Sequence, residues 1–349
     1  MDDSTQLGSS VTGGPKPLRR DMLALWGVVL FSLGYTGLIW LVGGRLEQVP
    51  HLPDQGASWY YWKLPEKTLW GQLTAWGFYL AHQFAMWGLI WYGQNRVKRY
   101  TTGLHPLNVI ALAANAFFIL LHLLQTHLWY DGLAQDVSIW SSQGSVIVLL
   151  IWVLLMENNR RGLFFGARLP LGQNLMRFAR KYHGYFFAWA IIYTFWYHPA
   201  EALSGHLWGF FYTTLLMLQG ALMFTRAHTN RYWTFTLEVV VLAHGTMVAV
   251  MQGGSMWPMF FFGFAGIFVM TQMHGLGLTR WIRGLILSAY LAAALWVYSG
   301  RGLENLHQIT WIPVIDYLGV AVLAALFSFS LWLMRRLSTL RTPRSGGVE

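Results

Sequence analysis

Residues 106–130, "PLNVIALAANAFFILLHLLQTHLWY", decide the fold because they contain no Asp, Glu, Lys or Arg. A helix needs about 20 apolar residues to cross the hydrocarbon core of a membrane, and this segment is longer. Similar runs recur along the 349 residues, of which 55% are hydrophobic and 11% are charged. Soluble domains have roughly a quarter of charged residues. The sequence therefore predicts an all-α, polytopic integral membrane protein that lies in a lipid bilayer.

Apolar runs bounded by charged residues predict about ten transmembrane helices in one bundle. They cover residues 22–43, 69–93, 106–130, 137–156, 183–199, 206–225, 232–251, 255–273, 281–299 and 313–334. Residues 21–337 are interpreted as a single transmembrane domain, and residues 1–20 and 338–349 as flexible cytoplasmic tails. The long segment 44–68 between the first two helices is rich in aromatic residues, which favours contact with lipid headgroups.

Lys and Arg gather in alternate loops, as they do in the cytoplasmic loops of membrane proteins. With the N-terminus inside, all but four of the 24 Lys and Arg residues fall on the cytoplasmic side. Both termini are therefore predicted to be cytoplasmic, and we expect a bacterial inner membrane. The net charge of +10 follows from this orientation and from contact with anionic lipid, so it does not require a nucleic-acid partner.

Several classes of chemistry are excluded by missing residues and motifs. The chain has no cysteine, which excludes disulfides, thiolate nucleophiles, iron–sulfur clusters and Cys-ligated zinc or haem. No Walker A, GxSxG or HExxH motif is present. The predicted helices contain no lysine, which excludes a retinal Schiff base.

The most unusual feature is a group of histidines near the outer ends of the predicted helices. Ionisable groups at membrane depth are costly and mark functional positions. Imidazole and carboxylate are the usual ligands of Fe, Cu and Zn where no thiolate exists. With Asp131 and Glu201 at the same level, we predict a metal site and a catalytic role for Glu201. The predicted metal ligands are His122, His127, His198, His206 and His244.

Two alternatives concern the same histidines. The turn "YHPAEALSGH", residues 197–206, can be an ordinary chain reversal whose histidines bond to backbone or water. The segment "HLLQTH", His122 to His127, resembles the first histidine box of membrane desaturases and hydroxylases. That family also has an HxxHH box and places its boxes on the cytoplasmic side. Neither property is found here, so the chain is not assigned to it.

Haem is the other predicted cofactor. His183 and His198 lie about four helical turns apart on one face, an arrangement that resembles diheme b-type cytochromes. The resemblance implies histidine pairs on two helices, but His228 and His244 are out of phase by the same geometry. A single outer haem b, with His122 as the partner of His198, is therefore the preferred form of this prediction. His183 and Trp129 are the cofactor-binding candidates.

Three carboxylates elsewhere need an explanation in a membrane protein. Glu238 lies inside the predicted helix 232–251, where a carboxylate must be protonated, paired or facing water. Arg226 or Arg231 is its expected structural partner, and a proton relay toward His244, with Glu238 as a catalytic residue, is the functional alternative. Glu157 is expected to pair with Arg160 and Arg161. We interpret Asp316 as a helix N-terminal cap.

These features favour a metal- or haem-dependent oxidoreductase acting on a lipid-soluble substrate, such as a quinone, near the outer face. Three alternatives remain from other classes. They are a proton-coupled transporter, a metal-free membrane transferase with a histidine base, and an accessory subunit of a redox or photosynthetic complex. The last would require partner subunits in the membrane.

Overall fold

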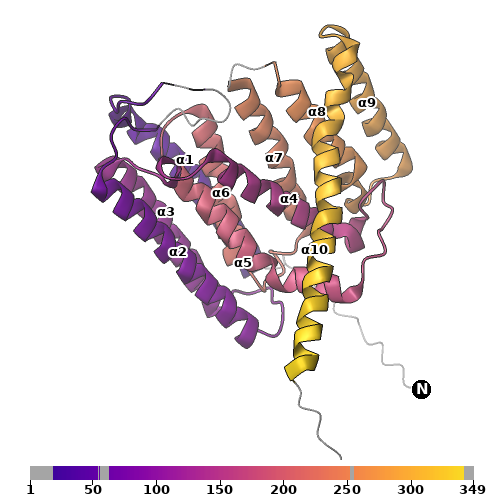
Figure 1. Cartoon of the computed structure of the whole chain (residues 1–349), viewed down its shortest axis with the longest axis horizontal. Coiled ribbons are helices and arrows are strands. Elements are labelled where there is room, and N and C mark those ends of the chain that lie inside the picture. The colour runs from indigo at the N-terminus through magenta and orange to yellow at the C-terminus, as the bar shows by residue number, and fades with distance from the viewer. Residues whose placement is uncertain (1–18, 54, 56–62, 252–254, 342–349) are drawn as a thin grey trace, which may run out of the picture.

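The computed structural model describes residues 19–341 apart from 54, 56–62 and 252–254. The predicted tail up to residue 18, residues 342–349 and the aromatic cluster at 59–62 therefore lie outside the described part of the chain. Within the described part the fold is all-helical, with ten α-helices and no β-strand (Figure 1). This confirms the all-α part of the prediction.

The helices follow the predicted apolar runs closely. They are α1 (Arg20–Val42), α2 (Leu69–Arg96), α3 (Pro106–Trp129), α4 (Ile139–Arg161), α5 (Gln173–Tyr197), α6 (Ser204–Ala221), α7 (Arg231–Met251), α8 (Trp257–Met270), α9 (Arg280–Ser299) and α10 (Trp311–Arg341). Short 3-10 segments lie at Gly43–Leu46, Leu133–Gln135, Gln272–Gly275 and Leu303–Thr310.

Helix α5 differs most from the prediction because it begins well before residue 183. Its first turns bury Leu175, Met176 and Ala179 against α4, while Arg177 and Arg180 on the opposite face remain exposed. The indole nitrogen of Trp152 on α4 lies 3.3 Å from the carbonyl oxygen of Ala179. The basic residues that suggested a loop therefore form the exposed face of an amphipathic helix.

Six segments are long and apolar enough to cross a membrane. They are Arg20–Leu46, Pro106–Trp129, Ile139–Arg161, Arg231–Met251, Arg280–Ser299 and Leu303–Leu337. Their outer surfaces are rich in apolar side chains, and Trp281 on α9 is 90% exposed. Exposed apolar surface of this extent marks a membrane or protein contact. The chain therefore has the composition and helix lengths of an integral membrane protein.

Helix α6 packs against α1 and α3, and both neighbours run antiparallel to it. At its last turn the Asn108 side chain of α3 donates to the Ala221 carbonyl at 2.8 Å. Before its first turn the Ala200 amide donates to Thr126 on α3 at 3.1 Å. On the α1 side, a Cβ added to Gly43 would collide with the side chain of Ala202. We call the two ends of this bundle the Glu201 end and the Asp21 end.

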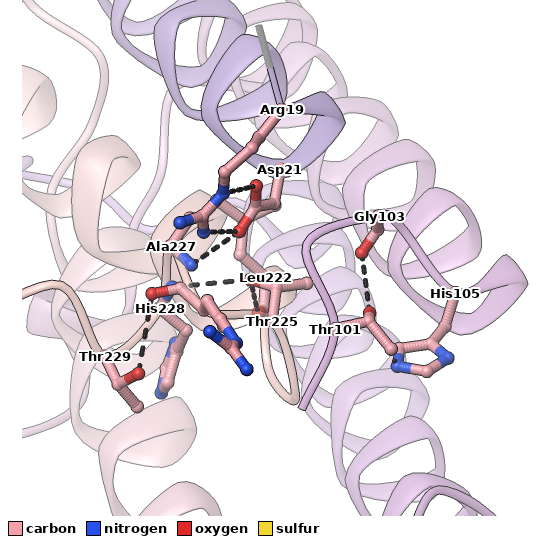
Figure 2. A network of polar contacts seen from close by, with 11 residues as sticks. Arg19, Asp21, Thr101, Gly103, His105, Leu222, Thr225, Ala227, His228 and Thr229 are labelled. Carbon is pink, nitrogen blue, oxygen red and sulfur yellow. Dashed lines mark hydrogen bonds and ion pairs between the residues drawn. The ribbon is translucent and has the colours of Figure 1, made fainter. Parts of the chain in front are cut away.

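Hydrogen bonds join three segments at the Asp21 end (Figure 2). Asp21, fully buried at the start of α1, pairs with Arg19 at 2.6 Å and accepts from the Ala227 amide at 2.8 Å. The Thr101 amide donates to the Phe224 carbonyl at 3.1 Å, which links the α2–α3 and α6–α7 connections. Nδ1 of His228 lies 3.0 Å from the Gln219 carbonyl. The polar groups of this end thus have partners within the protein.

Helices α7 to α10 form a second group beside the first, with α4 and α5 between them in Figure 1. The contact between α4 and α10 is close because Gly319 faces Ile151, whose side chain an added Cβ would overlap. Apolar side chains of α4, α5 and α10 form the core between the two groups. Beside this core, residues of α4, α7, α8 and α10 line a pocket.

Candidate functional site

The connection between α5 and α6 positions the polar residues of the Glu201 end. Helix α5 ends at Tyr197 because Pro199 disfavours helical backbone at the residue before it, and His198 is extended at φ −102° and ψ 142°. Helix α6 then begins at Ser204, which points the chain back into the bundle. His198, Glu201 and His206 are thereby gathered at one end of the bundle.

Glu201 is buried and is surrounded by groups that can hold or release a proton. The Tyr130 hydroxyl donates a short hydrogen bond to its Oε1 atom. Nε2 of His51 lies 3.3 Å from Oε1 and 2.5 Å from the Tyr130 hydroxyl. Nδ1 of His206 lies 3.8 Å from Oε2. One carboxyl group therefore contacts a phenol and two imidazoles from three other segments of the chain.

Burial biases the protonation of these groups. It raises the pKa of Glu201, an effect that the hydrogen bond from Tyr130 opposes. It lowers the pKa of the His51 imidazole. Both shifts favour the uncharged forms, as expected where little water can solvate a charge. A proton can thus reside on the carboxyl group while the neighbouring imidazole is neutral.

Tyr130 lies in a strained conformation that places its hydroxyl beside Glu201. It follows the last residue of α3 with φ 39° and ψ 81°, in the left-handed region. Residues other than glycine are uncommon there, and such strain persists where the surrounding structure holds it, often at functional sites. The amide of Tyr130 still donates to the Thr126 carbonyl at 3.0 Å, so the helix end is closed.

Three more histidines lie close to this group. The rings of His198 and His206 are 5.4 Å apart between centroids. His122 on α3 is fully buried, with the rings of Phe195 and Trp196 at 4.6 and 4.7 Å. The backbone of His198 is its nearest polar neighbour, but neither of its ring nitrogens has a hydrogen-bond partner with normal geometry among the described residues.

His244 reaches the same region from α7. It lies over Gly209 of α6, where an added Cβ would be 3.4 Å from its Cε1 atom. It is within electrostatic range of His198 and His206. Its Nδ1 atom has no hydrogen-bond partner in the described part of the chain. His122, His198, His206 and His244 therefore lie in one region of the bundle, and of these four His206 is the one whose ring contacts Glu201 in the described part of the chain.

The remaining predicted residues lie elsewhere. His127 contacts two backbone carbonyls, those of Leu123 at 2.9 Å and Val42 at 3.3 Å. His183 lies near the other end of α5, with Nδ1 2.7 Å from the Arg180 carbonyl. Trp129 is the last residue of α3 and is half-buried. The structure thus gives His127 and His183 backbone partners.

Glu238 has a different partner from the one predicted. It pairs with Arg161 at 2.7 Å, not with Arg226 or Arg231, because the C-terminal end of α4 packs beside α7. Of the two partners predicted for Glu157, Arg160 bonds to it, whereas Arg161 pairs with Glu238 instead. The carboxyl of Glu238 is therefore neutralised by a buried guanidinium rather than by the loop arginines.

Asp131 is buried beside α2 and not against the histidines. A Cβ added to Gly71 in the first turn of α2 would lie 2.8 Å from its Oδ2 atom. Burial raises the pKa of Asp131 to about 7, although the Gly132 amide donates to it. Burial alone would also raise the pKa of neighbouring Asp136, but hydrogen bonds from Lys67, Trp76 and Gln72 outweigh it and the net shift is downward.

Among the described residues, no group of three or more His, Asp or Glu side chains has the geometry to hold a metal ion. Sequence reasoning missed two residues of the site, His51 and Tyr130. His51 belongs to the segment 44–68, which was interpreted as a contact with lipid headgroups. The one signal in the sequence that could have identified His51 is its position close to the predicted outer end of a helix.

Comparisons with known proteins yield no assignment: no family model matches the chain, and no curated protein or solved structure is significantly similar to it.

Proposed function

We propose that the chain is an integral membrane oxidoreductase whose reactive site is the Glu201 end of the bundle. The observation that supports this proposal is a set of buried ring nitrogens without a hydrogen-bond partner of normal geometry among the described residues. They belong to His122 and to Nδ1 of His244, which lie near His198. Nearly all buried polar atoms in proteins are paired, and an unpaired one costs about 1–3 kcal/mol. Such a cost persists where the atom has another task, such as binding an ion.

Transition-metal ions are the ligands that fit this chemistry best. Neutral imidazole and carboxylate bind Fe, Cu and Zn, and a redox-active Fe or Cu ion can accept electrons. The rings are not arranged around one point, so an ion requires His198 and His206 to turn toward it together with His122 or His244. Haem b is less suitable because the aromatic rings of Phe195 and Trp196 cover His122.

The substrate class follows from the position of the site in an apolar bundle. A quinol could enter from lipid, and a bound Fe or Cu ion would accept its two electrons one at a time. The Glu201 carboxylate would take one proton in each of the two steps and release it before the next. A membrane partner subunit or soluble acceptor would reoxidise the ion after each step. The hydrogen bond that the Tyr130 hydroxyl donates to Oε1 would favour the ionised form of Glu201, which is the form that accepts a proton.

We also propose that the chain crosses the bacterial inner membrane about ten times, with both termini cytoplasmic. The distribution of Lys and Arg supports this orientation, which gives the Glu201 end an outer position. The chain has no cysteine, so an introduced cysteine is the only thiol that a labelling reagent can modify. Cysteines replacing Ser138 and Asn230 should react with impermeant thiol reagents from opposite sides. Labelling of both from the same side would contradict the orientation.

The function can be tested with protein purified in detergent. We expect about one Fe or Cu per chain by elemental analysis, and reduction of that ion by a soluble quinol in an anaerobic absorption titration. Glu201→Gln should slow the reduction at least tenfold. His127→Gln is the matched control, because His127 lies at the same end but bonds to backbone, and it should react normally. If the purified protein is folded but contains no metal, the proposal that it is a metal-dependent oxidoreductase is wrong.

A second candidate function rests on the contact of Tyr130, Glu201 and His51. A carboxyl group with a phenol and an imidazole is suited to general acid–base chemistry without a metal. This candidate corresponds to the membrane transferase. It is favoured if the metal-free protein binds an apolar substrate and loses activity in Glu201→Gln, but is insensitive to chelators.

A further inference from the structure

A second buried site lies between α4, α7, α8 and α10, away from the Glu201 end. It is a cavity of about 150 Å³, a volume comparable with cavities that bind a benzene-sized molecule. Most of its wall is aliphatic or aromatic. The residues that matter here are Leu154, Val239, Phe264, Phe268, Glu238 and Asp316.

Asp316 is the unexpected member of this wall. The sequence suggested that it caps a helix, but α10 begins at Trp311, so Asp316 lies in the second turn. It is only 5% exposed, because the nearby Gly319 brings this face of α10 against α4. No hydrogen bond or ion pair joins its carboxyl to any residue that the structure describes. It is thus a buried acidic group in the wall of an apolar cavity.

The charges around the cavity do not balance within the protein. Glu238 is matched by Arg161 at 2.7 Å, and the guanidinium of Arg161 is almost completely buried in that pair. Asp316 has no corresponding cation. With Asp316 ionised, the three buried groups therefore have a net charge of −1. An isolated carboxylate in an apolar environment is costly unless a cation joins it or it becomes protonated.

We propose that this pocket binds a small organic amine, with its ammonium group paired to Asp316 and its apolar body against Phe264 and Phe268. One positive charge completes the charge balance, and a benzene-sized body matches the volume. Metal cations fit less well, since hard ions take six to eight oxygen ligands and the wall is mainly apolar. The site is separate from the proposed redox site and does not depend on it.

Matched aromatic probes test the proposal on the full-length protein in detergent. We would compare 4-fluorobenzylamine with 4-fluorobenzyl alcohol by fluorine NMR titration, using protein-free micelles as the baseline. The amine should bind the wild type at least tenfold more tightly than the alcohol. Asp316→Asn should remove this preference and leave alcohol binding unchanged. Asp136→Asn, the same change at an acidic residue of the Glu201 end, should retain the preference.

Equal binding of the two probes to the wild type would overturn the proposal and indicate that Asp316 is protonated. Unchanged amine binding in Asp316→Asn would also overturn it. If that variant does not fold, Val239→Phe provides a second test by filling the cavity. Val239→Phe should weaken binding of the amine probe at least tenfold. An unchanged affinity would show that the amine binds outside this pocket.

Discussion

The two ends of α6 treat their buried histidines differently. At the Asp21 end, His228 contacts the backbone carbonyl of Gln219 at 3.0 Å, and the Gln219 amide returns a bond to the His228 carbonyl at 2.9 Å. At the Glu201 end, His122 has no normal hydrogen-bond partner in the described part of the chain. Both imidazoles are in the same bundle, so membrane depth alone does not distinguish them.

This difference separates a structural role from a functional one. A buried polar group that is fully bonded stabilises the fold, whereas one that lacks partners lowers stability. Figure 2 shows the first situation, in which Asp21 at the start of α1 accepts a hydrogen bond from the Ala227 amide that follows α6. Substitutions of the bonded groups at the Asp21 end should therefore destabilise the protein, whereas replacing His122 or His244 should not.

The largest expected effect concerns Asp131 at the Glu201 end. Its pKa is raised from 3.8 to about 7, so the folded protein holds a proton that the unfolded chain releases near pH 4. Its contribution therefore makes stability fall as pH rises from about 4 to 7, by up to about 4 kcal/mol. Asp131→Asn should remove this dependence in thermal unfolding followed by tryptophan fluorescence. Identical pH profiles for the two proteins would contradict the raised pKa.

At the Asp21 end, Asp21→Ala should lower the free energy of unfolding by about 3 kcal/mol. It removes a hydrogen bond from a buried amide to a charged group and leaves the Ala227 amide without a partner. Arg19→Ala is the matched control. Arg19 is partly exposed, and exposed ion pairs contribute about 1 kcal/mol or less. Urea titration in detergent measures the free energy of unfolding of both variants. Equal losses of stability would show that the hydrogen bond to the buried Ala227 amide contributes no more than the partly exposed ion pair.

Exchanging the two histidines for leucine sharpens the comparison. His122→Leu removes two unpaired nitrogens and should stabilise the protein by about 1 kcal/mol. His228→Leu should destabilise it by about 1–2 kcal/mol, since Gln219 loses a partner. The shift in melting temperature should thus have opposite signs in the two variants. A loss of stability in both would remove the distinction between the ends.

The smallest effect is expected for Tyr130→Phe. The Tyr130 hydroxyl lowers the pKa of Glu201, so its removal should raise that pKa further. The change can be followed through the carboxyl stretch in an infrared pH titration, with Glu201→Gln to assign the band. A Glu201 band that titrates at the same pH in the variant would show that the phenol does not act on the carboxylate.

The helices could be predicted from the sequence because lipid-exposed helices are apolar over their whole length. The prediction failed at the start of α5, where basic residues occupy one exposed face and only the opposite face is buried. His198, Glu201 and His206 could be grouped because one short connection contains all of them. His51 and Tyr130 come from distant segments, and a sequence does not show which connections meet in space.

Partners of buried charges were harder to predict than their positions. Glu238 was expected to pair with a loop arginine close in sequence, but tertiary packing places Arg161 beside it. Asp316 was assigned to a helix start, because the 3-10 segment Leu303–Thr310 before α10 has no clear signal in the sequence. Both differences depend on how α4 meets α7 and α10, which apolar periodicity does not encode.

We propose that the unpaired imidazoles near the Glu201 end serve chemistry, whereas the paired ones at the Asp21 end serve structure. The most direct test is the metal content of purified wild type, His244→Leu and His228→Leu, measured together by elemental analysis. We predict about one Fe or Cu per chain in the wild type and in His228→Leu, and at least a tenfold loss in His244→Leu. A wild type without metal, or an equal loss in both variants, would contradict the account.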